Sequence, residues 1–407
     1  MRAITEPLIR SRSGALIAAL AFSTLATGVL LISVPLELRQ LHAAPGEIGV
    51  TLSMFGFGMF AFEWLWGVIA DRAGYRAPLV ASQLLYGACI VLLGLAHGVP
   101  MIAVAYFLAS GAMVAVGPIG RSYVGTALHT KLRATGLALL SAQWVIAEAV
   151  GSGAGGQLID HVPIRSVVLG AAALPLISAA LSAWVFRGYS HSIHRSAHAA
   201  EAEAAEEAGP ATASAGAVLA VTAAIVLLVQ LGIGGELALL PLLVTTKLGL
   251  PASSAGTAML AVGLVGGALL VPGGSVADRW GRKPTMVAGG IVSAVGFAVY
   301  AVAGSLPQVL AGATLRAAGA SLIWPAATAW IAESVPPRRH ALFMGLFGEF
   351  ENIGITLGPA LGGLAWSWFG IQSAFYVYCV AALLAAGVAA FAVRSRGVRP
   401  VAEPARL

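Results

Sequence analysis

Charged residues are scarce in this sequence of 407 residues, because only 10% of them are Asp, Glu, Lys or Arg, whereas 58% are hydrophobic. A soluble domain averages about 25% charged residues, so this chain has too few of them to cover a surface that faces water. Its outer surface must therefore face lipid, where only helices and closed barrels satisfy the backbone. The hydrophobic runs are continuous rather than alternating, which disfavours a barrel and predicts membrane-spanning helices.

The sequence also lacks the residue patterns of disulfides, metal sites, nucleotide binding and common catalytic sites. The two cysteines, Cys89 and Cys379, lie in separate apolar runs, which argues against a disulfide or a metal site. A nucleotide-binding loop of the form Gly-x4-Gly-Lys-Ser/Thr is absent, so ATP is not the direct energy source. No histidine lies in the middle of a span, and no Ser-His-Asp or His-x3-His arrangement falls within one. We expect no enzyme, no cofactor and no metal ion.

The apolar runs predict an all-α membrane protein with twelve transmembrane helices. Several connections are only a few residues long, so neighbouring helices must run antiparallel. The expected spans are residues 14–36, 47–70, 77–97, 99–122, 134–158, 164–186, 216–245, 252–275, 285–303, 307–331, 341–365 and 370–392. Residues 1–187 and 216–407 would each form a six-helix bundle, and the His- and Glu-rich residues 188–215 would form a cytoplasmic linker between them.

The distribution of charge predicts an orientation. With the N-terminus in the cytoplasm, most of the 23 basic residues fall in loops on the cytoplasmic side, as the positive-inside rule requires. This bias explains the net charge of +6 without a nucleic-acid partner. We expect an integral protein of the cytoplasmic (inner) membrane with both termini in the cytoplasm.

The chain contains an internal repeat. Gly67-x3-Asp71-Arg72-x-Gly74-x-Arg76 returns as Gly274-x3-Asp278-Arg279-x-Gly281-Arg282-Lys283, at an offset of 274 − 67 = 207 residues. Ala147-x3-Gly151-Ser152-x2-Gly155-Gly156 pairs at the same offset with Gly354-x3-Gly358-Pro359-x2-Gly362-Gly363. Pro35 and Pro45 match Pro241 and Pro251 at an offset of 206. Parallel repeats of six helices imply a site at the membrane midplane between the two halves.

These motifs resemble those of the major facilitator superfamily across nearly the whole chain. Within it, the sequence looks most like the twelve-helix drug:proton antiporter group, although two positions depart from the family pattern. Tyr75 replaces a usual basic residue in the first motif copy. The glycine motif of the antiporters has its proline in the fifth helix, but here Ser152 stands there and the proline, Pro359, lies in the eleventh helix.

The two motif copies predict a gate at the cytoplasmic end. Gly67 and Gly274 would let helices approach closely, and Gly74 and Gly281 suit tight turns with positive φ. The resemblance implies that Asp71 latches against the start of the eleventh helix in the outward-open state, where an anion is favoured. The other gating residues that we expect are Arg72, Arg76, Arg121, Glu63, Asp278, Arg279 and Arg282. The alternative for all of them is a static cytoplasmic cap.

Six charged residues lie within the predicted spans: Glu63, Glu148, Glu236, Arg316, Glu349 and Glu351. Each costs about 2.5–3.5 kcal/mol at a helix centre, so each needs a partner or a wet cavity. We expect Arg316 to pair with Glu148 or Glu236 and to alter the proton affinity of that carboxylate. The alternative is a structural salt bridge. Glu351, Trp144 and Trp324 are further candidates for the substrate cavity.

The glycine-rich stretches permit close packing and bending of helices. The resemblance implies that they form the interface between the halves: Gly151, Gly155, Gly156, Gly354, Gly358, Pro359 and Gly362. The alternative is ordinary helix packing.

Together these features predict a monomeric secondary transporter that works by alternating access and is most plausibly a proton-coupled exporter of a small organic or drug-like molecule. The alternative is a proton symporter or facilitator that imports a small metabolite such as a sugar or organic acid, in which Arg316 would bind a substrate carboxylate.

Overall fold

The computed structural model describes residues 12–128, 130–187, 213–335 and 340–393, and this part of the chain is helical throughout, without strands. The first half contains α2 (Ser13–Gln40), α3 (Pro45–Ala73), α4 (Arg76–Gly94), α5 (Val99–Met113), α6 (Val116–Ala127), α7 (Thr130–Ile159), α8 (Ile164–Ala171) and α9 (Ala173–Val185). The second half contains α11 (Ala213–Leu242), the π-helical turn η1 (Leu243–Lys247), α12 (Ala252–Trp280), α13 (Arg282–Val302), α14 (Leu306–Ser334), α15 (His340–Phe369) and α16 (Gln372–Ala392). The predicted linker, residues 188–215, lies almost wholly outside the described residues.

The expected fold class is confirmed. Eleven spans of the described residues are long and apolar enough to cross a membrane. The remaining expected span, the eleventh in chain order, is α15, which has 30 residues but carries Glu349, Glu351 and Asn352 among its apolar positions. Two of the spans are each built from two helices, since α5 gives way to α6 near Val114 and α8 gives way to α9 at Ala172.

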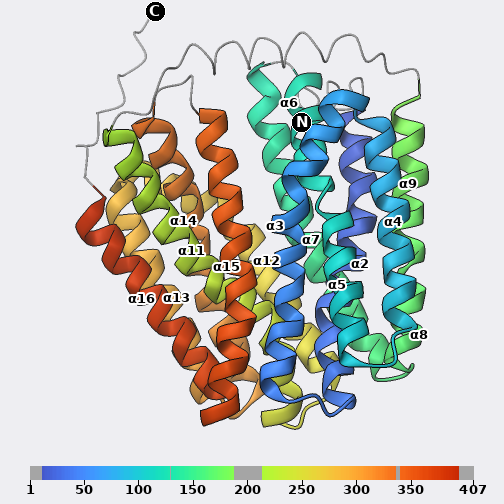
Figure 1. The fold of residues 1–407 in the computed structure, drawn as a ribbon. Helices are drawn as coiled ribbons and strands as arrows, with labels where there is room; N and C mark the ends of the chain where they lie inside the picture. The colour runs from blue at the N-terminus through green and yellow to red at the C-terminus, as the bar shows by residue number, and fades with distance from the viewer. Residues whose placement is uncertain (1–11, 129, 188–212, 336–339, 394–407) are drawn as a thin grey trace, which may run out of the picture.

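The two halves lie side by side, with α2 to α9 on the right of Figure 1 and α11 to α16 on the left. Most contacts between the halves come from two pairs of helices, α3 with α15 and α7 with α12, and α2 makes a smaller contact with α11. We call the end of the molecule that carries the turns at Gly74 and Gly281 the motif end. The opposite end, which carries residues 41–44, 160–163 and 248–251, is the far end.

The hydrophobic cores show how the halves are joined. At the far end one continuous core contains residues of both halves, including Ile32, Ile48, Leu239 and Phe375. At the motif end each half has a separate core. The first contains Leu16, Ala70, Tyr75, Tyr123 and Phe186, and the second contains Ala277, Trp330, Phe343, Phe347 and Val393. Among the described residues, the halves therefore share their apolar packing at the far end, whereas at the motif end each half packs on its own core.

Glycines allow the close contact at the far end. A Cβ on Gly49 would collide with the backbone of Pro359 and Gly363, and one on Gly156 would collide with Ala252 and Gly256. Towards the motif end the surroundings change, because no neighbouring atom of the described residues would lie within 4 Å of a Cβ on Gly67, Gly345 or Gly348. The expectation that Gly67 marks a close approach of helices is therefore wrong for this conformation.

Candidate functional site

The two motif turns have the predicted backbone. Gly74 has φ 79° and Gly281 has φ 92°, values that favour glycine because a side chain would be strained there. Each glycine also ends a helix, since its N–H donates to the carbonyl of Ala70 (2.8 Å) or Ala277 (3.1 Å). The sequence repeat thus reproduces one helix ending in both halves.

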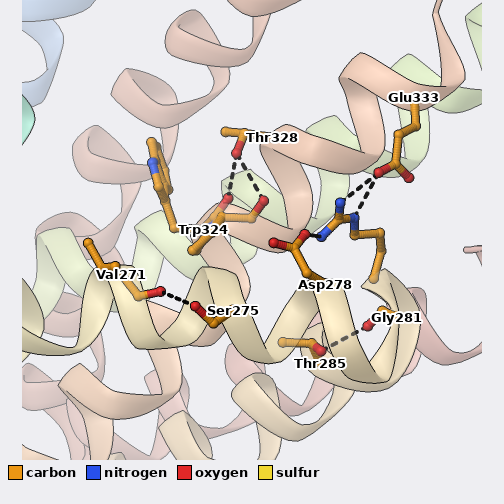
Figure 2. Close-up of polar contacts among 10 residues, drawn as sticks. Val271, Ser275, Asp278, Gly281, Thr285, Trp324, Thr328 and Glu333 are labelled. Atoms are coloured by element: carbon orange, nitrogen blue, oxygen red, sulfur yellow. Dashed lines mark hydrogen bonds and ion pairs between the residues drawn. The ribbon is translucent and has the colours of Figure 1, made fainter. Parts of the chain in front are cut away.

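The second motif copy forms a charged fork within its own half (Figure 2). Nη1 of Arg282 lies 2.6 Å from Oδ1 of Asp278, and its Nη2 lies 2.7 Å from Oε1 of Glu333 on α14. The Asp278 and Glu333 side chains are 69% and 47% exposed, so these bonds contribute little to stability in water. Their geometric effect is to tie the turn at Gly281 to the end of α14. Gly274 lies at an ordinary contact within its own half, since a Cβ there would be 3.6 Å from Pro325 of α14.

The first motif copy is arranged differently. Asp71, Arg72 and Arg76 are exposed at the motif end. Arg121 of α6, which we expected to complete the network of this loop, forms an ion pair with Glu63, another of the expected gating residues, at 2.5 Å between Nη2 and Oε1. Glu63 lies about two turns before Asp71 on α3, so this pair is deeper than the loop. The latch of Asp71 against α15 stays a prediction.

Glu63 also connects the two halves. Its second carboxylate oxygen, Oε2, accepts a hydrogen bond of 2.8 Å from Nδ2 of Asn352 on α15. On the same helix, Glu351 accepts a hydrogen bond of 2.8 Å from Nε2 of Gln230 on α11. Glu63, Arg121 and Asn352 form what we call the seam network, because it bridges α3, α6 and α15 at the level where the shared core divides.

Arg316 pairs with one of the two glutamates considered for it, Glu236. Its Nε lies 2.5 Å from Oε2 of Glu236, and their side chains are only 6% and 1% exposed. The hydroxyl of Tyr300 donates a hydrogen bond of 2.6 Å to Oε1 of the same carboxylate. This triad, which we call the buried triad, joins α11, α13 and α14 inside the second half. Such pairing is what an ion pair in a low-dielectric interior requires.

Glu148 stands apart from these pairs. It is half-buried on α7, with Trp144 one turn earlier on the same helix. No ion pair joins Glu148 to any residue in the described ranges. The nearby Tyr86 gives its hydroxyl to a contact of 2.9 Å with Thr27. Unlike Glu63 and Glu236, Glu148 therefore has no cationic partner among the described residues.

The aromatic candidates lie in different surroundings. Trp144 is partly buried against the shared core. Trp324 packs edge-on against Phe347 at 5.0 Å between ring centroids and belongs to the separate core of the second half. Figure 2 shows Trp324 beside Thr328, whose hydroxyl donates to its carbonyl at 3.1 Å.

Most of the glycines predicted to lie at the interface between the halves instead face a helix of their own half. A Cβ on Gly151 or Gly155 would meet α2 of the same half. One on Gly354, Gly358 or Gly362 would meet α11 or Tyr378, again within the same half. Only Gly156 and Pro359 of the expected set contact the other half. The cause is the pitch of the helix, because residues four apart line one face and that face turns towards the helix of the same bundle.

Several residues of the site were not predicted. Asn352 and Gln230 gave a usable signal, since each is a polar amide within an apolar run and thus needs a partner. Tyr300 gave none, because an aromatic residue in an apolar run is indistinguishable from a packing residue.

A polar seam between two helical repeats, set in a chain with an apolar surface, is the arrangement of a membrane transporter. The chain belongs to the Major Facilitator Superfamily, whose family model matches residues 16–235 and 222–406. The family and the structural neighbours are transporters rather than enzymes.

Two groups of relatives share part of the sequence. The chain is 38% identical over 114 residues to an uncharacterized MFS-type transporter of Mycobacterium tuberculosis, a match that covers 26% of this chain and 27% of the relative. It is 33% identical over 159 residues to the multidrug resistance protein MdtH of Edwardsiella ictaluri, covering 39% of this chain and 38% of the relative. The matched stretches thus span about a quarter to two-fifths of these relatives.

Solved structures share the fold over nearly the whole chain. A bacterial homolog of the human lysosomal transporter Spinster has a TM-score of 0.75 at 15% identity, covering 95% of this chain and 97% of its own. The nucleoside transporter NupG has a TM-score of 0.73 at 13% identity, covering 94% and 100%. At such low identity these likenesses concern the fold alone.

Proposed function

We propose that this chain is a secondary active transporter that exports a small organic or drug-like molecule in exchange for protons, by alternating access between its two halves. The motif end faces the cytoplasm of the cell, with both termini, because the basic residues gather there. The protein acts as a monomer in the inner membrane. The name of the relative MdtH, a multidrug resistance protein, supports the substrate class.

The observation that carries this proposal is the division of the hydrophobic core. One core joins the halves at the far end, and two separate cores face one another at the motif end. Two halves packed in this way can tilt relative to each other, so that the motif end closes and the far end opens. The substrate then binds where the shared core divides, beside the seam network, with Glu351, Trp144 and Trp324 as further cavity residues.

Proton coupling requires a carboxylate that can change its charge during this cycle. Glu148 fits this role, because it is half-buried, has no cationic partner among the described residues and lies on α7, which contacts the other half through α12. Glu236 fits it less well, because Arg316 and Tyr300 occupy its oxygens in this conformation. The same pair weakens the import alternative, since Arg316 is not available to a substrate carboxylate here.

The test is transport by the purified protein in proteoliposomes after a pH jump, with cationic dyes compared with sugars and organic acids. We expect movement of a dye against the proton flow, and collapse of that movement by a protonophore. Transport of a sugar or acid together with protons, or transport that ignores the pH gradient, would contradict the proposal.

A further inference from the structure

The end of α7 contacts the start of α12 through a carboxylate. Asp160 directly follows α7 in the first half, and its two oxygens accept hydrogen bonds from the backbone N–H groups of Ala252 (2.9 Å) and Ser253 (3.1 Å). These are the first two residues of α12, in the second half. A side chain of one half thus caps a helix of the other half, at the far end.

Helix dipoles explain the direction of this contact. The C-terminal end of a helix carries partial negative charge, so a carboxylate is unfavourable at the end of α7, its own helix. The N-terminal end of α12 carries unpaired N–H donors and partial positive charge, so a carboxylate is favourable there. Asp160 therefore gains its favourable surroundings only while the two halves touch at the far end.

The internal repeat provides a comparison. At the start of α3 the backbone N–H of Ala44 donates to Glu47 of the same helix, at 2.9 Å. At the offset of 206 that relates Pro45 to Pro251, the repeat places Ser253 at the equivalent position of α12 (47 + 206 = 253), and α12 has no side-chain cap of its own. The cap that α3 supplies for itself is supplied to α12 by Asp160 from the other half.

The other crossing of the halves lacks such a contact. Ser367 is the repeat equivalent of Asp160 (160 + 207 = 367) and lies near Gly46 at the start of α3. Its hydroxyl, however, donates to the carbonyl of Gly363 in its own helix, at 3.0 Å. At the far end, the α7–α12 crossing therefore has a charged cap between the halves. The polar contact described at the α3–α15 crossing, between Asn352 and Glu63, lies nearer the motif end.

We propose that Asp160 is a far-end latch, a positioning residue whose cap on α12 stabilises the conformation closed at the far end and must be released in every transport cycle. This inference rests on the proposed alternating access. It places a helix cap between the halves at the end opposite to the two sequence motifs. Opening of the far end must therefore break the hydrogen bonds of this cap, which raises the free energy of the open conformation.

The experiment measures the distance between spin labels at His97→Cys and Ser305→Cys, two exposed far-end positions, one in each half, in protein with Cys89 and Cys379 replaced by Ala. Loss of a helix cap corresponds to about a twofold to thirtyfold change in the ratio of two states. We expect Asp160→Ala to raise the ratio of far-end-open to far-end-closed protein by such a factor, and Asp160→Asn, which keeps an acceptor oxygen, to raise it less. The control Ser367→Ala should leave the ratio unchanged.

An unchanged ratio in Asp160→Ala would overturn the latch, and so would a lower melting temperature without a change of ratio, because that result indicates a purely structural cap. The assay needs no substrate. If the ratio changes but the protein fails to move dyes, the latch is upheld and the proposed substrate is contradicted. If the protein moves dyes efficiently but the ratio does not change, the proposed substrate is upheld and the latch is contradicted.

Discussion

The two halves share their framework but not their buried charges. Both repeat copies end a helix at a glycine with positive φ, Gly74 and Gly281. Leu30 occupies the position that corresponds to Glu236, at the offset of 206 that relates Pro35 to Pro241 (236 − 206 = 30). Ile355 occupies the position that corresponds to Glu148 (148 + 207 = 355). Duplication has therefore kept the shape of the bundle, whereas each half has its own polar chemistry: an enclosed triad in the second and a carboxylate without a cation in the first.

The largest effect is expected from removing the cation of the buried triad. Arg316→Ala leaves Glu236 buried without its partner, which typically destabilises a protein by about 3–5 kcal/mol. Thermal unfolding of the purified protein in detergent should show a large loss of stability or of folded yield. Combining the change with Glu236→Gln should restore much of the loss. If Arg316→Ala is as stable as the parent protein, the ion pair of the buried triad does not stabilise the second half.

Glu148→Gln tests the carboxylate of the first half, which lacks a cationic partner among the described residues. Since Glu148 has no ion pair to lose, its substitution should leave thermal stability nearly unchanged and should reduce pH-driven transport at least about tenfold, a change equivalent to about 1.4 kcal/mol. Downhill exchange of substrate without a pH gradient should persist. The measurement is flux in proteoliposomes with and without a gradient, and normal gradient-driven flux in the variant would assign the proton to another residue.

The seam network should have a smaller effect, on conformation rather than on folding. Asn352→Ala removes a hydrogen bond to a charged group that joins the two halves, an interaction of about 1.5–3 kcal/mol. We expect less of the protein to adopt the conformation open at the motif end, as measured by spin-label distances. Gln230→Ala is the matched control, because it removes a bond to Glu351 within one half. Equal shifts in both variants would show that the seam network does not couple the halves.

The smallest effect is expected at the far end, where Arg165 and Glu37 form an ion pair of 2.9 Å within the first half. The Arg165 side chain is 41% exposed, and such pairs contribute about 0.2–1 kcal/mol. Arg165→Ala should change the melting temperature by a degree or two at most and should leave transport unaltered. A severe loss of transport would reveal a role for this region that its exposure does not indicate.

The sequence predicted the framework of this molecule better than its polar contacts. Hydrophobic runs and the repeat at Gly67 and Gly274 were enough for the helices and the two halves, because burial in lipid dictates both. The turns at Gly74 and Gly281 followed from backbone sterics. The partners of Arg121 and the surroundings of Gly151 could not be predicted, because they depend on how far each helix is rotated and tilted against its neighbours.

The central claim is that the two ends open in alternation, and a pair of distances tests it most directly. One pair of spin labels, at Ala77→Cys and Pro284→Cys, reports on the motif end, and the pair at His97→Cys and Ser305→Cys reports on the far end. Across a series of pH values and transported dye, we predict that the far-end distance lengthens whenever the motif-end distance shortens. Distances that stay fixed, or that lengthen together, would contradict alternating access in this protein.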